Sequence, residues 1–258
     1  MMNEKTINEQ YAYIRTLLEE KRLKEALMQL ESLLWQCPDW ALRTRLEQLQ
    51  TSYKYMLEYM KQGANDPDRW NLYQKMVADT WGIADQSRLL MLDNASSRYY
   101  HEVRRTPRSA DLSNYGIKTI LHILESFNDD LAVSGLLSDE KMDEVLRRHE
   151  DTLKFMFIRT WTNSAWTPED EEDAKAMLAS ELLPGDDLCL FVSALTLSLM
   201  ECFDLRKIMW LLNAYEHPNV NVSQRALVGT MIIFHIYRSR LSIYPELIKS
   251  VDLIEKIQ

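Results

Sequence analysis

One segment of the chain, residues 98–108, concentrates the residue types best suited to binding an anion. It carries four arginines against one glutamate, with tyrosines beside them, in a chain whose formal net charge is −9. Guanidinium groups bind phosphates and carboxylates through paired hydrogen bonds, and tyrosine rings stack on nucleobases. The residues of this segment that we expect to contact a partner are Tyr99, Arg104, Arg105 and Arg108.

The same segment has a simpler interpretation that needs no ligand. A helix that ends before Pro107 would place these arginines in its last turn, where the helix dipole favours cations. Because the rest of the chain is acidic, the sequence favours this structural interpretation over a binding patch.

The histidines and the acidic run lack the spacing of a metal site. None of the five histidines is paired with another at four residues, and none follows a glutamate by three residues as in di-iron proteins. His149 falls on an apolar helical stripe, which predicts a hydrogen-bonded side chain at the edge of the core. The acids between Glu169 and Asp173 follow Thr167-Pro168, so the first turn of a helix explains them. We therefore expect no metal and no cofactor.

No catalytic sequence motif is present. The chain has no G-x-G-x-x-G, no G-x-x-x-x-G-K-[ST], no G-x-S-x-G and no H-E-x-x-H. Its 6 glycines are few for a fold that relies on glycine-rich phosphate loops. These absences favour a binding protein over an enzyme, and we assign no catalytic residue.

The cysteines and the apolar stretches predict a cytoplasmic protein with no membrane segment. Cys37, Cys189 and Cys202 are odd in number, have no C-x-x-C spacing and lie in apolar helical stretches, so they are expected to be buried thiols. The N-terminus has no signal-peptide pattern. The uncharged stretch Leu188–Met200 is shorter than the roughly 20 residues that a bilayer span needs.

The elements that must position these residues are helices. Apolar residues recur at three and four residues along most of the chain, for example at Leu23, Ala26, Leu27 and Leu30, and no strand alternation or hairpin turn is evident. Helix starts are expected at Asp66-Pro67-Asp68, Ser138-Asp139 and Thr167-Pro168. The sequence predicts an all-α protein of roughly twelve helices.

The N-terminal helices have the layout of a tetratricopeptide repeat (TPR). Residues 7–40 form two predicted helices around a tight turn, and Ala26, Leu30 and Pro38 stand where that repeat has its small residue, its large apolar residue and its closing proline. The unit resembles one such repeat, although Gln10 and Ile14 depart from the pattern.

The C-terminal third contains two predicted helix pairs that share an Ala-Leu step at 194–195 and 226–227. The sequence Gln224-Arg225-Ala226-Leu227 resembles the first helix of a HEAT-like or armadillo-like repeat, in which an arginine precedes a packed alanine. The first helix of each pair is apolar nearly all round, as expected of a helix between neighbouring repeats.

These resemblances imply an α-α superhelix of helical hairpins. The predicted divisions are a TPR-like hairpin with a long helix (1–62), an irregular helical region (63–137) and HEAT-like repeats (138–258), or one continuous domain. The function implied is a non-enzymatic scaffold for protein–protein interaction whose partner is a protein or peptide. The alternative is a nucleic-acid-binding HEAT-like protein similar in architecture to alkylpurine DNA glycosylases, which the net charge of −9 disfavours. The sequence gives no oligomeric state.

Overall fold

The computed structural model describes residues 2–37, 39–63, 67–106, 115–136 and 138–250. In these ranges it has twelve delimited α-helices and no strand, which confirms the predicted all-α class. The chain forms two compact units: unit 1 is Met1–Arg105 with Tyr237–Gln258, and unit 2 is Thr106–Ile236. These units are groups of residues in mutual contact, which need not be domains that fold on their own. The three divisions expected from the sequence therefore stay predictions.

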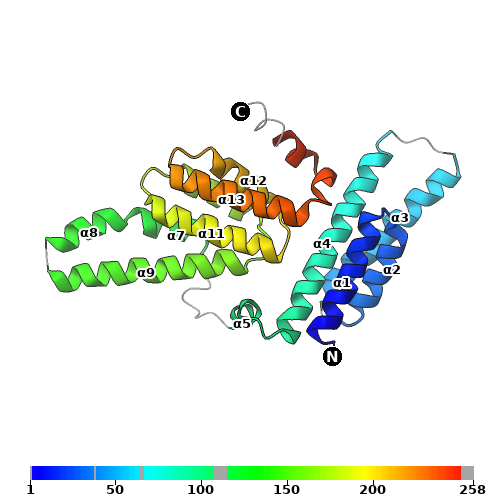
Figure 1. Cartoon of the computed structure of the whole chain (residues 1–258), viewed down its shortest axis with the longest axis horizontal. Helices are drawn as coiled ribbons and strands as arrows, with labels where there is room; N and C mark the ends of the chain where they lie inside the picture. Colours follow the sequence, from blue (N-terminus) through cyan, green and yellow to red (C-terminus); the bar gives the residue numbers. More distant parts are fainter. Residues whose placement is uncertain (1, 38, 64–66, 107–114, 137, 251–258) are drawn as a thin grey trace. The chain divides into compact units, whose positions relative to one another are not determined.

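Unit 1 is built from two helical hairpins. Its helices are α1 (Glu4–Glu19), α2 (Leu23–Leu34), α3 (Trp40–Lys61), α4 (Arg69–Ala95) and α5 (Tyr99–Arg105), with the 3-10 helix η1 (Leu241–Ile243) and a helical segment at 245–250. Helix α4 packs against α1, α2 and α3, and the four lie side by side in Figure 1. The helix start expected at Asp66-Pro67-Asp68 is found there, with Asp68 as the N-cap and Arg69, two residues after Pro67, as the first residue of α4.

The apolar stripes predicted for unit 1 form its core. Leu17, Leu30 and Leu33 are fully buried, together with Trp81 of α4. The stripe along α3 is buried as far as Met56, whereas Met60 is 44% exposed. The predicted buried face therefore ends before the helix does.

A buried ion pair links the C-terminal segment of unit 1 to α4. Arg240 donates two hydrogen bonds to Asp85, at 2.5 Å from Nη1 to Oδ2 and 3.1 Å from Nη2 to Oδ1. The Tyr11 hydroxyl donates to Oδ1 of the same carboxylate at 2.6 Å. The guanidinium lies 4.1 Å from the ring centroid of Trp81 and 4.7 Å from that of Tyr237. The charge is thus paired, hydrogen-bonded and enclosed by aromatic rings.

Unit 2 consists of two rows of helices. Its elements are α7 (Ile117–Glu125), α8 (Phe127–Gly135), α9 (Asp139–Thr162), α10 (Pro168–Ala179), α11 (Gly185–Glu201), α12 (Leu205–Tyr215) and α13 (Val220–Tyr237), the last residue of which belongs to unit 1. Helix α11 packs on α9 and α12, and α10 packs on α7 and α12. One row contains α9, α11 and α13, which lie side by side in Figure 1. The contacts of α10 with α7 and α12 form the other row.

Local capping signals set the helix starts of unit 2. Thr167 caps α10 and Pro168 is its first residue, as the sequence predicted, and the structure adds a reciprocal capping box between Thr167 and Asp170. Ser138 caps α9 by accepting a hydrogen bond from the Lys141 amide, which confirms a second predicted start. Leu146, one turn before His149 on α9, is 43% exposed although it is apolar.

Candidate functional site

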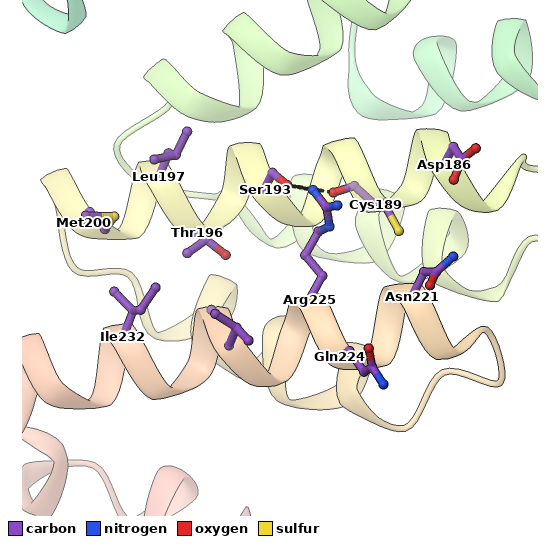
Figure 2. A pocket seen from close by; sticks show the side chains of 12 residues that line it. Asp186, Cys189, Ser193, Thr196, Leu197, Met200, Asn221, Gln224, Arg225 and Ile232 are labelled. Carbon is purple, nitrogen blue, oxygen red and sulfur yellow. Dashed lines mark hydrogen bonds between the residues drawn. The ribbon is translucent and has the colours of Figure 1, made fainter.

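Two helices of unit 2, α11 and α13, run side by side in the same direction and leave a groove between them (Figure 2). Helix α11 is apolar nearly all round, and neighbouring elements cover it on several sides. Leu188, Phe191 and Leu195 are buried by this packing. The groove lies along the remaining side of the helix. It has a volume of about 580 Å³, within the range of binding clefts.

A glycine allows α13 to approach α11 at the floor of the groove. A Cβ atom built on Gly229 would lie 2.4 Å from the Thr196 hydroxyl oxygen and 3.4 Å from a methyl carbon of Leu211. Thr196 is held in place because its hydroxyl donates to the Val192 carbonyl at 2.9 Å. The close contact between the helices therefore depends on the absence of a side chain at Gly229.

Arg225 spans the groove and joins the two helices. Its Nη1 atom donates to the Ser193 hydroxyl oxygen at 2.7 Å, and Figure 2 shows this bond crossing from α13 to α11. Ser193 in turn donates to the Cys189 carbonyl at 3.0 Å. Arg225 and Ala226 are the two residues that resemble a HEAT-like helix. Ala226 is fully buried, and Arg225 forms a hydrogen bond with the neighbouring helix α11.

The two ends of the groove differ in chemistry. Leu197, Met200 and Ile232 lie at one end, and Asp186 and Asn221 lie at the other, as labelled in Figure 2. Among the groove residues that the structure describes, Asp186 and Arg225 carry the charges, one of each sign. Such a surface suits a long amphipathic partner better than a polyanion.

Apolar side chains of α13 are exposed both in the groove, at Val228 and Ile232, and beside it, at Leu227 and Met231. Val228 is 57% and Met231 is 65% exposed, and Leu227 and Ile232 are exposed as well. The sequence pattern predicted a helix covered on all sides by neighbouring repeats. That prediction is wrong for this face of α13, because these four side chains stay substantially exposed.

Cys189 lines the groove without the properties of a nucleophile. Burial raises the pKa of its thiol, and the nearby guanidinium of Arg225 only partly offsets this effect. The thiol is therefore protonated at neutral pH, whereas a reactive cysteine needs a stabilised thiolate. Cys37, Cys189 and Cys202 are all free and buried, as predicted.

His149, predicted to lie at the core edge, is paired with a carboxylate in the structure. Its Nε2 atom lies 3.3 Å from Oδ2 of Asp187, and its ring stacks on Phe127 with 3.7 Å between ring centroids. Burial raises the pKa of Asp187, an effect that the adjacent His149 partly offsets. His149 thus connects α9 to α11 through Asp187 and to α8 through Phe127, which is a structural role within unit 2.

The predicted binding segment, residues 98–108, is divided by the structure. Tyr99 and Arg105 lie on α5 of unit 1 and are exposed. Arg104 is largely buried, and its Nε atom donates to both carboxylate oxygens of Asp93 at 3.1 Å. Arg108 lies outside the described residues. The charge of Arg104 is thus compensated within the protein by Asp93, whereas the partner contacts expected of Tyr99, Arg104, Arg105 and Arg108 stay a prediction.

Asp93 also binds a buried histidine of the same segment. Nδ1 of His101 lies 2.8 Å from Oδ1 of Asp93, and the His101 side chain is fully buried. This carboxylate therefore fixes α5 on α4 through two side chains. No sequence signal points to this carboxylate, since Asp93 precedes the arginine-rich segment.

Across the described ranges, no cluster of three or more histidine, cysteine, aspartate or glutamate side chains is placed to hold a metal ion. Among the same residues, no helix combines the length and apolar character required to span a bilayer.

Comparison with protein-family models, with curated proteins and with solved structures finds no match to this chain. The resemblances to TPR and HEAT-like repeats therefore rest on the residues quoted for them, and the repeat type stays a prediction.

Proposed function

We propose that this chain is a non-enzymatic scaffold that binds an amphipathic helix of a partner protein in the α11–α13 groove. The observation that carries the proposal is the row of exposed apolar side chains, Val228 and Met231 on α13 with Met200 on α11, beside a preformed cleft. Exposed apolar surface next to a groove is typical of helix-in-groove recognition.

The arrangement of helices supports a repeat scaffold. In unit 2 α11 and α13 are parallel neighbours, and α12 connects them, as the first helices of successive HEAT-like repeats would be. A row built in this way presents its first helices on one surface. Partner binding then needs no reactive group, only a fixed spacing between helices.

The groove chemistry specifies the partner helix. We expect apolar side chains at positions i, i+3 or i+4 and i+7, which would lie along Leu197, Met200 and Ile232. Polar side chains at one end of the partner helix would contact Asp186 and Arg225. Since the described groove residues include one cation, a nucleic-acid backbone, which needs several, fits less well.

Site-specific photo-crosslinking tests the proposal. A benzoylphenylalanine replacing Val228 should crosslink to a partner segment with this apolar spacing, and the synthetic segment should bind the whole protein as a helix. The matched control carries the probe at Leu146, an exposed apolar position on α9 of the same unit.

The variant Val228→Asp/Ile232→Asp places two charges on exposed positions and should weaken binding of the segment by about a hundredfold. Crosslinks that are the same from positions 228 and 146, or a segment that binds the double variant as tightly as the wild type, would overturn the proposal.

A further inference from the structure

A second groove, in unit 1, has a different chemistry. It lies between α3 and α4, has a volume of about 560 Å³ and is lined by Tyr53, Met56 and Met60 from α3 and by Trp70 and Tyr73 from α4. The charged lining residues that the structure describes are Lys21 and Arg69, both cations. The α11–α13 groove has neither this aromatic content nor this charge.

The aromatic wall of the groove is preformed. The rings of Trp70 and Tyr73 stack with 5.7 Å between centroids and 22° between planes. Trp70 is nevertheless 60% exposed, and Met60 across the groove is 44% exposed. Large exposed rings and a thioether provide adaptable apolar contact area, which is typical of peptide-binding surfaces.

Lys21 is held at the rim by the turn between α1 and α2. The turn is a Schellman motif: the Arg22 amide donates to the Leu17 carbonyl at 2.8 Å, and the Lys21 amide donates to the Leu18 carbonyl at 3.1 Å. Lys21 occupies the left-handed position of the motif, with φ of 61°. The Tyr73 hydroxyl donates to the Lys21 carbonyl at 3.3 Å, which ties the turn to the groove wall.

The acids of that turn are already bound to another cation. Arg22 pairs with Glu20, at 2.8 Å from Nη1 to Oε2, and also with Glu25, at 2.9 Å from Nε to Oε1. Neither glutamate forms an ion pair with Lys21. Among the described residues, neither Lys21 nor Arg69 forms an ion pair, so the two charged side chains that line the groove are cations with no carboxylate bound to them, although the chain is acidic.

We propose that the α3–α4 groove binds a short acidic segment of a partner protein, with one aromatic or aliphatic side chain inserted against Trp70 and Met60. Aspartate or glutamate residues flanking that anchor would pair with Lys21 and Arg69. The apolar wall provides the contact area and the two cations select the charge. This site is independent of the α11–α13 groove, because it lies in the other unit and recognises another chemistry.

Selection from a displayed library of random dodecapeptides on the whole protein tests this inference. We expect enrichment of peptides that carry an apolar anchor between acidic residues. One enriched peptide, synthesised with a fluorescent label, is then titrated against variants. The variant Lys21→Gly/Arg69→Gln removes both charges, and glycine is the residue best suited to the positive φ of position 21, so the turn is kept.

The expected result is a loss of affinity of at least about tenfold for Lys21→Gly/Arg69→Gln and for Trp70→Ala. The matched control Lys24→Gln/Lys54→Gln removes two exposed cations of unit 1 that are not among the groove residues, and it should bind the peptide like the wild type. Thermal unfolding of each variant verifies its fold.

Two results would overturn the inference. One is a library that yields no enriched peptide, or peptides without acids around the anchor. The other is an enriched peptide whose affinity is the same for the wild type and for both groove variants. Neither result bears on the crosslinking from Val228, so the two proposals fail separately.

Discussion

Unit 1 and unit 2 share the same kind of helical sequence, yet they hold their helices together by different means. In unit 1 a buried charge, Arg240 on Asp85, ties the C-terminal segment to α4. In unit 2 the contact between α11 and α13 depends on a missing side chain, at Gly229 against Thr196. The stability of unit 1 should therefore depend on the paired charges of Arg240 and Asp85, and that of unit 2 on the absence of a side chain at Gly229.

The largest effect is expected from Asp85→Ala in unit 1. Burial alone lowers the pKa of Arg240, but the Asp85 carboxylate raises it above its ordinary value, so the guanidinium is charged in the folded protein. Without Asp85 this charge would be buried and unpaired, which costs about 3–5 kcal/mol of unfolding free energy. Urea denaturation measures the loss.

The double variant Asp85→Leu/Arg240→Met is the control for that experiment. Because it removes both charges and keeps apolar volume, it should recover most of the stability lost by Asp85→Ala. If Asp85→Ala costs less than about 1 kcal/mol, the buried pair does not hold unit 1 together.

The next effect is expected from Gly229→Ala in unit 2. The added methyl group collides with Thr196 and forces α13 away from α11, at a cost of about 1–3 kcal/mol. Adding Thr196→Ala should restore part of the loss, since it removes the atom that the methyl group meets. Denaturation of the two single variants and the double variant gives the coupling free energy between positions 229 and 196. If the two changes in unfolding free energy simply add, the methyl group does not collide with Thr196.

A smaller effect concerns pH and Asp187. Burial raises the pKa of this carboxyl in the folded protein, so the folded state binds more protons than the unfolded state above the ordinary aspartate pKa of 3.8. The contribution of Asp187 to stability is complete below that value and is lost as the pH rises through the raised pKa. Denaturation at a series of pH values should show this decrease in the wild type.

The variant Asp187→Asn should lack that decrease. Its unfolding free energy should change less with pH than that of the wild type over the same range, although His149 and Asp186 remain in place. Identical pH profiles for the two proteins would show that Asp187 does not titrate differently in the folded state.

The smallest effect, with the opposite sign, is expected from Gly82→Ala. Gly82 lies inside α4, and a Cβ atom there would meet nothing within 4 Å. Alanine should therefore stabilise the protein by about 0.5–1 kcal/mol through its helix propensity. A raised melting temperature is expected, and destabilisation comparable to that of Gly229→Ala would remove the contrast between the two units.

The sequence predicted most of the local structure because local structure depends on neighbouring residues. The helix start at Thr167-Pro168 and the buried stripe of α2 are confirmed, and each is set within a few residues. The partners of buried charges could not be predicted in this way. Arg240 and Asp85 are 155 positions apart, and no pattern of spacing connects them.

The candidate site was harder to predict for the same reason. The clustering of arginines at 98–108 is visible in the sequence, but Asp93, which binds Arg104, becomes its neighbour only through folding. The apolar pattern of α13 predicted a covered helix, and only the packing of unit 2 reveals which side stays exposed. A repeated apolar pattern thus specifies that a helix is formed, whereas its exposed face depends on the neighbouring elements.

Methionine methyl resonances provide the most direct test of the proposed docking in unit 2. The whole protein, labelled with carbon-13 at its methionine methyl groups, is titrated with the partner segment found by crosslinking. We expect the signals of Met200 and Met231 to shift with a common saturation curve while buried Met177 stays unchanged. Saturable binding that leaves both Met200 and Met231 unshifted would contradict docking in the α11–α13 groove.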